Sequence, residues 1–166
     1  MIGVGNPIMA DDGFGLRVLA RLPERWELPD DVQLVDGGTW GMALLPTIEE
    51  SGRLIILDAI NTASPPGTVA VVERADLPRY FALRLSPHQI DLREVLGACE
   101  LRGTLPDEMV AMGVQPGEIA LRVGLTPAVA ARVDEVAALV AARLEAWGHL
   151  VKPRPARDRR LAACDG

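Results

Sequence analysis

The stretch Leu54-Ile55-Ile56-Leu57-Asp58 decides the fold, because it is a fully apolar strand whose last residue is a carboxylate. On both sides of it, the apolar pattern switches repeatedly between short β-rich runs and longer runs of helical period. This alternation is typical of βαβ units joined into a mostly parallel sheet. We therefore predict an α/β fold, with one three-layer α/β/α domain whose central sheet is mixed and mainly parallel.

Local patterns predict where the strands and helices lie. The predicted strands are residues 1–4, 32–36, 54–58, 68–73 and 108–113. Apolar residues at helical spacing predict helices at 13–22 and 40–50. A third helix opens at Ser86-Pro87-His88-Gln89, where Ser86 is the N-cap and Gln89 closes a capping box. The last helix is predicted to begin at Thr126-Pro127 and to continue until Gly148.

Length and composition limit the class of protein. About half of the 166 residues are apolar, which suffices for one sizeable core. We place one domain at residues 1–151 and a basic tail, predicted to be disordered, at 152–166. The net charge of −6 disfavours nucleic acid and anionic membranes as partners, which leaves a protein or a cation. Without a signal peptide, an apolar membrane span or paired cysteines, the protein is expected in the cytoplasm.

The loop Gly3-Val4-Gly5-Asn6-Pro7 follows a predicted strand and precedes a helix, as a dinucleotide-binding loop does. A phosphate binds to backbone N–H groups, however, and Pro7 has none. Asp11 and Asp12 also stand at the helix entrance, where two carboxylates repel a pyrophosphate and attract a cation. Helix capping is the alternative role for these aspartates, and a nucleotide-binding enzyme stays as an alternative function.

Asp12 and Asp58 are predicted to face one cleft, because the carboxyl ends of strands line the functional crevice of an open α/β sheet. His88 lies in the first turn of its helix, where the helix dipole disfavours the imidazolium and leaves a nitrogen available for a metal. Together the three residues would form a site for a divalent transition metal such as nickel or zinc. His149 is predicted to be exposed and inert.

Nucleophilic chemistry by serine or cysteine is disfavoured. No serine lies in a Gly-x-Ser-x-Gly elbow, and Cys99 falls on a buried helical stripe. The segment Asp36-Gly37-Gly38-Thr39 is interpreted as a structural turn that borders the cleft.

Six motifs, in this order along the chain, resemble those of the hydrogenase maturation endopeptidases. They are Gly3-Val4-Gly5-Asn6 with Asp11-Asp12-Gly13, Asp36-Gly37-Gly38-Thr39 with Gly41, Leu54 to Ala59, Ser86-Pro87-His88-Gln89, Gly113-Val114-Gln115-Pro116 and Gly124-Leu125-Thr126-Pro127. The resemblance covers nearly all of the chain before the basic tail. It implies an aspartic-type endopeptidase that activates a hydrogenase by removing the C-terminal extension of a [NiFe] hydrogenase large-subunit precursor after nickel insertion.

The resemblance also implies how the site works. The family's metal-contacting residues fall here on Asp12, Asp58 and His88, with aspartate where the first position is often glutamate. The nickel comes with the precursor and serves as the recognition signal, and zinc or cadmium could substitute for it in a crystal. A monomer is expected, and a non-proteolytic nickel-binding accessory protein is the alternative function. Because family members carry more apolar residues before the first Gly-x-Gly, a misplaced start codon or a truncated N-terminus is expected.

Overall fold

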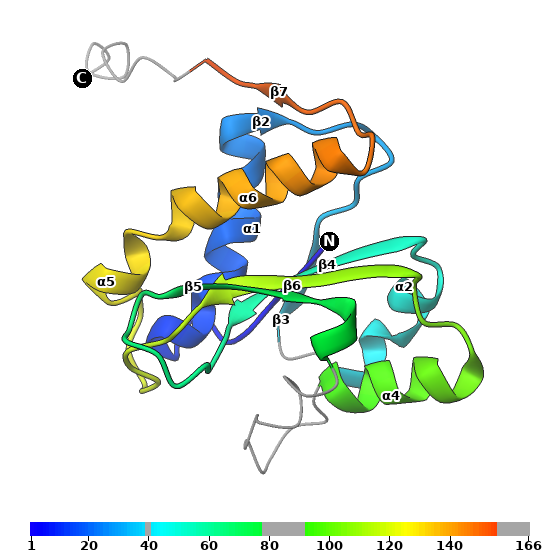
Figure 1. Cartoon of the computed structure of the whole chain (residues 1–166). Helices are drawn as coiled ribbons and strands as arrows, with labels where there is room; N and C mark the ends of the chain where they lie inside the picture. The colour runs from blue at the N-terminus through cyan, green and yellow to red at the C-terminus, as the bar shows by residue number, and fades with distance from the viewer. Residues whose placement is uncertain (39–40, 78–91, 156–166) are drawn as a thin grey trace, which may run out of the picture.

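A five-stranded sheet forms the centre of the protein in a computed structural model that describes residues 1–38, 41–77 and 92–155 (Figure 1). Its strand order is β3-β1-β4-β6-β5, and only β5 at the edge runs antiparallel to its neighbour. The strands are β1 (Ile2–Val4), β3 (Val35–Gly38), β4 (Arg53–Ala59), β5 (Val69–Glu73) and β6 (Glu108–Val114). The predicted mixed, mainly parallel sheet is confirmed.

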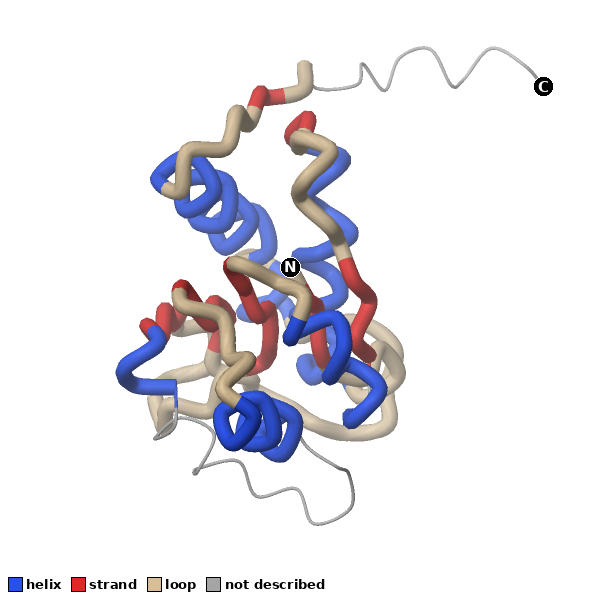
Figure 2. Tube along the Cα trace, turned by 90° about the vertical axis from the view of Figure 1, so that its right-hand side faces the viewer, coloured by secondary structure: helices blue, strands red, loops and turns tan. Residues whose placement is uncertain are grey.

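Helices cover both faces of this sheet, as Figures 1 and 2 show. One face carries α1 (Phe14–Arg25) and α6 (Val133–Ala146), with the short α5 (Pro127–Ala130) leading into α6. The other face carries α2 (Leu45–Glu49) and α4 (Leu92–Arg102). In the part of the chain that the structure describes, 3-10 turns also occur at η1 (Ala10–Gly13), η2 (Gly41–Leu44) and η3 (Arg74–Asp76). The predicted three-layer α/β/α arrangement is confirmed, and no helix in the described ranges is long and apolar enough to cross a membrane.

The central strand β4 contributes to two separate hydrophobic clusters, because neighbouring side chains of a strand point to opposite faces. Ile55 and Leu57 pack with α1 and α6, whereas Leu54 and Ile56 pack with α2 and α4. All four side chains are buried. By the same alternation, Asp58 belongs to the face of the sheet that α2 and α4 cover.

The amino end of α1 packs directly on the backbone of the sheet. A Cβ atom added at Gly15 would lie 2.1 Å from the carbonyl oxygen of Leu57 and 2.6 Å from that of Val4. Since any side chain at position 15 would push α1 away from β1 and β4, this glycine brings η1 and its aspartates against the ends of both strands.

The order of the strands creates a switch point between β1 and β4. From β1 the chain passes through α1 to β3 on one side, and α2 then returns it to β4 on the other side of β1. From β4 the chain continues away from β1, to β5 and β6. Open α/β sheets bind their ligands at such a point, outside the carboxyl ends of the strands.

Three predicted elements differ in the structure. The strand predicted at 32–36 is β3 at Val35–Gly38, so Gly37 and Gly38 belong to a strand and not to the predicted turn. A Cβ at Gly37 would lie 2.6 Å from Ile2 Cγ2, which explains why a glycine pair can occupy this strand beside β1. The helix predicted at 40–50 is divided into η2 and α2, since Pro46 in the first turn of α2 favours a new helix start.

The helix predicted from Thr126 to Gly148 is also divided. The amide of Arg132 donates to the carbonyl oxygen of Val129, a tight i to i−3 bond that separates α5 from α6. Beyond the predicted domain boundary, β7 (Lys152–Pro153) pairs antiparallel with β2 (Trp26–Glu27). Residues 156–166 of the predicted tail lie outside the described residues, as do Ser86 to Gln89 of the predicted helix start.

Candidate active site

Asp58 lies near the end of β4, and Asp12 lies in a turn that follows β1, so both belong to the carboxyl edge of the two strands that flank the switch point. Asp58 is the penultimate residue of β4, and Asp12 is in η1, which follows β1 and contacts β4. The predicted placement of these two carboxylates at one edge of the sheet therefore agrees with the backbone. The third predicted residue, His88, lies outside the described residues, so the three-residue site stays a prediction.

The Asp12 carboxylate is held over the end of β1 by a tight loop. Its Oδ2 atom accepts a hydrogen bond of 2.7 Å from the backbone amide of Asn6. Asn6 also closes the loop, because its carbonyl oxygen accepts from Met9 N at 3.0 Å and its side-chain Oδ1 accepts from Ile8 N at 3.2 Å. Gly5 makes this close return possible: its φ is +119°, and a Cβ there would lie 1.8 Å from the carbonyl oxygen of Asp12.

Asp58 is fully buried at the end of β4. Its Oδ1 atom accepts a hydrogen bond of 2.7 Å from the backbone amide of Ala59, which orients the carboxyl group relative to the strand. Burial of a carboxylate is costly unless other groups compensate its charge, and such residues are therefore often functional.

Asp11, next to Asp12, has a structural role that its sequence position does not reveal. Its side chain is fully buried and accepts four hydrogen bonds. The donors are Gly117 N at 2.9 Å, Glu118 N at 3.0 Å, Thr126 N at 2.6 Å and Thr126 Oγ1 at 2.9 Å. The two roles considered from the sequence, attraction of a cation and helix capping, do not describe Asp11. Its side chain instead joins η1 to the loop between β6 and α5.

The pKa of Asp11 follows from these contacts. Burial by itself raises the pKa, but the backbone amides of Thr126, Gly117 and Glu118 and the Thr126 hydroxyl together outweigh it. The pKa therefore lies below its ordinary value of 3.8. Asp11 is the ionised acceptor that keeps the two loops together.

A pH dependence of stability follows from this lowered pKa. The stabilisation by Asp11 should be fully present above the ordinary value of 3.8 and should be lost as the pH falls through the lower pKa of the folded state. Urea unfolding at a series of pH values from neutral to about 3 measures this. Because other carboxyl groups titrate as well, Asp11→Asn is the reference, and its stability should fall less steeply than that of the wild type below pH 3.8. If the free energies of unfolding of the wild type and of Asp11→Asn fell in parallel with pH, the lowered pKa assigned to Asp11 would be contradicted.

Gln115 is a second residue whose role was missed, although it lies in one of the six motifs. Its buried side chain accepts a hydrogen bond of 2.7 Å from Thr62 N through Oε1 and donates one of 3.1 Å to Pro116 O through Nε2. Its backbone carbonyl accepts from Gly67 N at 2.9 Å. Gln115 thereby holds the loop that follows Asp58 against the end of β6.

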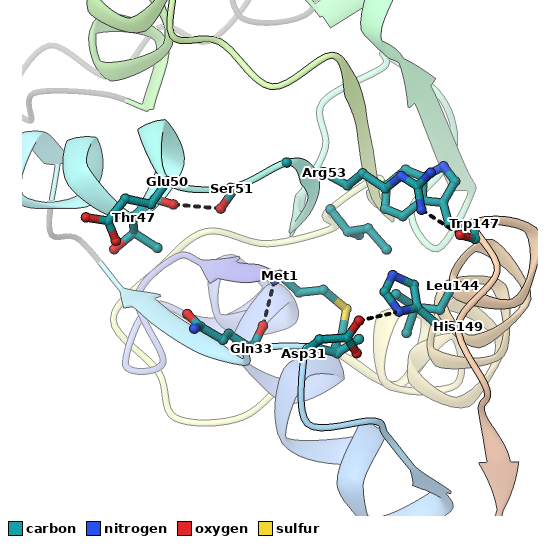
Figure 3. Close-up of a pocket in the computed structure, with 13 residues that line it drawn as sticks. Met1, Asp31, Gln33, Thr47, Glu50, Ser51, Arg53, Leu144, Trp147 and His149 are labelled. Carbon is teal, nitrogen blue, oxygen red and sulfur yellow. Dashed lines mark hydrogen bonds and ion pairs between the residues drawn. The ribbon is translucent and has the colours of Figure 1, made fainter.

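A pocket of about 510 Å³ lies at the opposite, amino-terminal edge of the sheet, where Met1 and Arg53 line it (Figure 3). His149 contributes to this pocket, and its Nδ1 atom lies 3.3 Å from Asp31 Oδ2. The prediction that His149 is exposed and inert is therefore wrong in its first part, because the side chain is only 20% exposed. The pocket is separated from Asp12 and Asp58 by the length of the strands.

Cys99 is buried on α4, as predicted, together with Leu92, Val95 and Leu96. Burial, with the nearby charge of Glu49, raises the pKa of its thiol and disfavours the reactive thiolate. Within the described ranges no three metal-ligating side chains cluster, and His88 is not among the residues described.

Comparisons with known proteins agree with this fold. Residues 16–143 match the family described as hydrogenase maturation protease. The hydrogenase 2 maturation protease of Escherichia coli is 37% identical over 94% of this chain and 96% of its own. HupD of Rhodobacter capsulatus, a hydrogenase expression/formation protein, is 38% identical over 95% of this chain and 81% of its own. The solved structure of the E. coli hydrogenase maturating endopeptidase HybD superposes with a TM-score of 0.87, at 37% identity, over 92% of this chain and 95% of that one.

The fold defines the class as a three-layer α/β protein whose sheet is mixed and mainly parallel, with carboxylates at the carboxyl edge of its switch point. Within that class, the chain belongs to the hydrogenase maturation protease family and is a peptidase.

Proposed function

We propose that this peptidase removes the C-terminal extension of a [NiFe] hydrogenase large-subunit precursor once nickel has been inserted. Asp12, Asp58 and His88 contact the nickel that the precursor carries, so the metal is part of the substrate. The observation that carries the proposal is that η1, which contains Asp12, contacts β4, which ends with Asp58 and Ala59, at the switch point of a hydrogenase maturation protease fold.

The alternation along β4 supports including His88. Asp58 belongs to the face of the sheet on which α4 packs, and α4 begins at Leu92, four residues after His88 in the sequence. Two carboxylates and an imidazole are ligands that suit nickel and zinc. Sharing the ligands of a metal already held by the precursor would align the protease with its cleavage segment.

The reaction itself is hydrolysis of one peptide bond. Water adds to the scissile carbonyl carbon, the C–N bond breaks, and the departing amine takes up a proton, which leaves a carboxylate at the new C-terminus. Contact with nickel makes this chemistry conditional, because the scissile bond is aligned only when the metal is present. Nickel is thus the signal that insertion is complete.

Precursor loaded with nickel should be shortened by the protein, whereas nickel-free precursor should remain intact. Mass spectrometry of both precursor and released peptide measures this and identifies the bond that is cut. The released peptide should come from the C-terminus alone. Equal cleavage of nickel-free precursor would contradict recognition through the metal, and tight binding of the nickel-loaded precursor without any cleavage would favour an accessory protein instead.

A further inference from the structure

Four large aliphatic side chains are exposed beside the switch point, on two loops that follow β1 and β6. We call them the apolar ridge: Ile8, Ile119, Leu121 and Val123. Leu121 and Val123 are 81% and 80% exposed, far more than a side chain of this kind that merely borders a core. Large aliphatic side chains exposed together on two loops that pair through their backbones point to an interaction site.

The backbone beneath the ridge is held firmly. Arg122 N donates to Ile8 O at 3.0 Å, and Ala10 N donates to Arg122 O at 2.7 Å, so the two loops are paired directly. The amide of Asp11 donates to Glu118 O at 3.1 Å, and the buried Asp11 carboxylate binds the same loop through its own acceptors. A pre-formed surface loses little conformational entropy on binding, which favours a docking role.

The ridge is also connected to the loop that holds Asp12 at the carboxyl edge of the sheet. Ile8 lies in the loop that Asn6 closes onto the Asp12 carboxylate, and Met9 forms a parallel bridge with Arg122. Val123 and Pro7 extend the same surface into a cavity of about 670 Å³ along α1. A partner that sits on the ridge is therefore aligned with Asp12.

We propose that the ridge docks an apolar patch on the folded body of the precursor, next to its cleavage segment. This inference rests on the proposed function and names the surface through which the client is recognised. A small ligand would need a concave site, whereas three of the four ridge side chains do not line the cavity and are about half exposed or more. An anionic membrane would need unpaired basic residues, whereas Arg122 forms an ion pair of 2.9 Å with Glu118 and the chain has a net charge of −6.

The double substitution Leu121→Ser and Val123→Ser tests the ridge. Loss of two docking side chains should lower kcat/KM for nickel-loaded precursor about 10-fold or more, chiefly through KM. The matched control is Leu101→Ser with Leu150→Ser, which removes two leucines that are also mostly exposed. Leu101 lies in the last turn of α4, ahead of the amino end of β6, and Leu150 follows α6 beside His149. Since all four side chains are exposed, both doubles should retain the thermal unfolding midpoint of the wild type.

Binding of immobilised precursor is measured alongside cleavage, so that the ridge is tested even where nothing is cut. Weaker binding and higher KM in the ridge double alone support the proposal. Unchanged binding in the ridge double, or equal losses in both doubles, overturns it. A wild-type dimer that the ridge double dissociates, with KM unchanged, also overturns it and assigns the ridge to a second copy of the chain. Tight, ridge-dependent binding without cleavage would instead contradict the proposed function while supporting the docking surface.

Discussion

Asp58→Asn should leave nickel-loaded precursor uncleaved, with a loss of rate of about 100-fold or more. Substitution of groups that only support a metal ligand costs 10- to 100-fold, and a direct contact should cost at least as much. Asparagine has the shape of aspartate and can still accept the hydrogen bond from Ala59 N, so the buried site at the end of β4 should keep its packing. Gel mobility of the precursor over time measures the loss.

The control is Asp107→Asn, an exposed carboxylate directly before the amino end of β6, at the opposite edge of the sheet. It should process precursor at the wild-type rate. Asp58→Asn should also show a cooperative urea unfolding transition near that of the wild type, which separates a lost contact from a lost fold. Normal processing by a well-folded Asp58→Asn would refute the site.

Asp11 and Asp12 should give opposite results when each is replaced by asparagine. Asp11→Asn should lower the free energy of unfolding by about 3 kcal/mol, because an amide nitrogen would face a backbone N–H that the carboxylate now accepts. Asp12→Asn should cost about 1 kcal/mol or less, since asparagine can accept the bond from Asn6 N through its remaining oxygen. Urea unfolding measures both changes.

Cleavage of the precursor should be affected in the opposite order to stability. Asp12→Asn should fail to cleave nickel-loaded precursor although it is stable, whereas Asp11→Asn should cleave it at temperatures where the variant remains folded. Each variant thus serves as the control for its neighbour, being the same substitution one residue away. If Asp12→Asn were destabilised and active, and Asp11→Asn stable and inactive, the roles assigned to the two residues would be exchanged.

Periodic segments were predicted well from the sequence because their burial depends on local spacing. Phe14, Val18 and Leu22 recur at helical spacing and are all fully buried in α1. The apolar run of β4 is a central strand, as predicted. Where spacing was ambiguous, the prediction failed: Gly37 and Gly38 lie in β3, and Ile2 of β1 packs against the space that a side chain at Gly37 would occupy.

Of the candidate site, the sequence predicted the position of Asp58, because a carboxylate that ends an apolar strand is conspicuous and its placement at the carboxyl edge follows from the parallel sheet. Its role as a site residue stays a prediction. Asp11 and Asp12 could not be told apart, because adjacent residues have the same local signals. The donors that distinguish Asp11 lie more than 100 residues further along the chain.

The sequence by itself determined the α/β class, the buried faces of the main helices and the likeness to hydrogenase maturation endopeptidases, since each depends on residue type and spacing along the chain. The tertiary structure decided the strand order that puts a switch point between β1 and β4, the structural role of Asp11 and the rigid support beneath the apolar ridge. These features depend on contacts between segments distant in sequence, which form only when the loops after β1 and β6 fold against each other at one edge of the sheet.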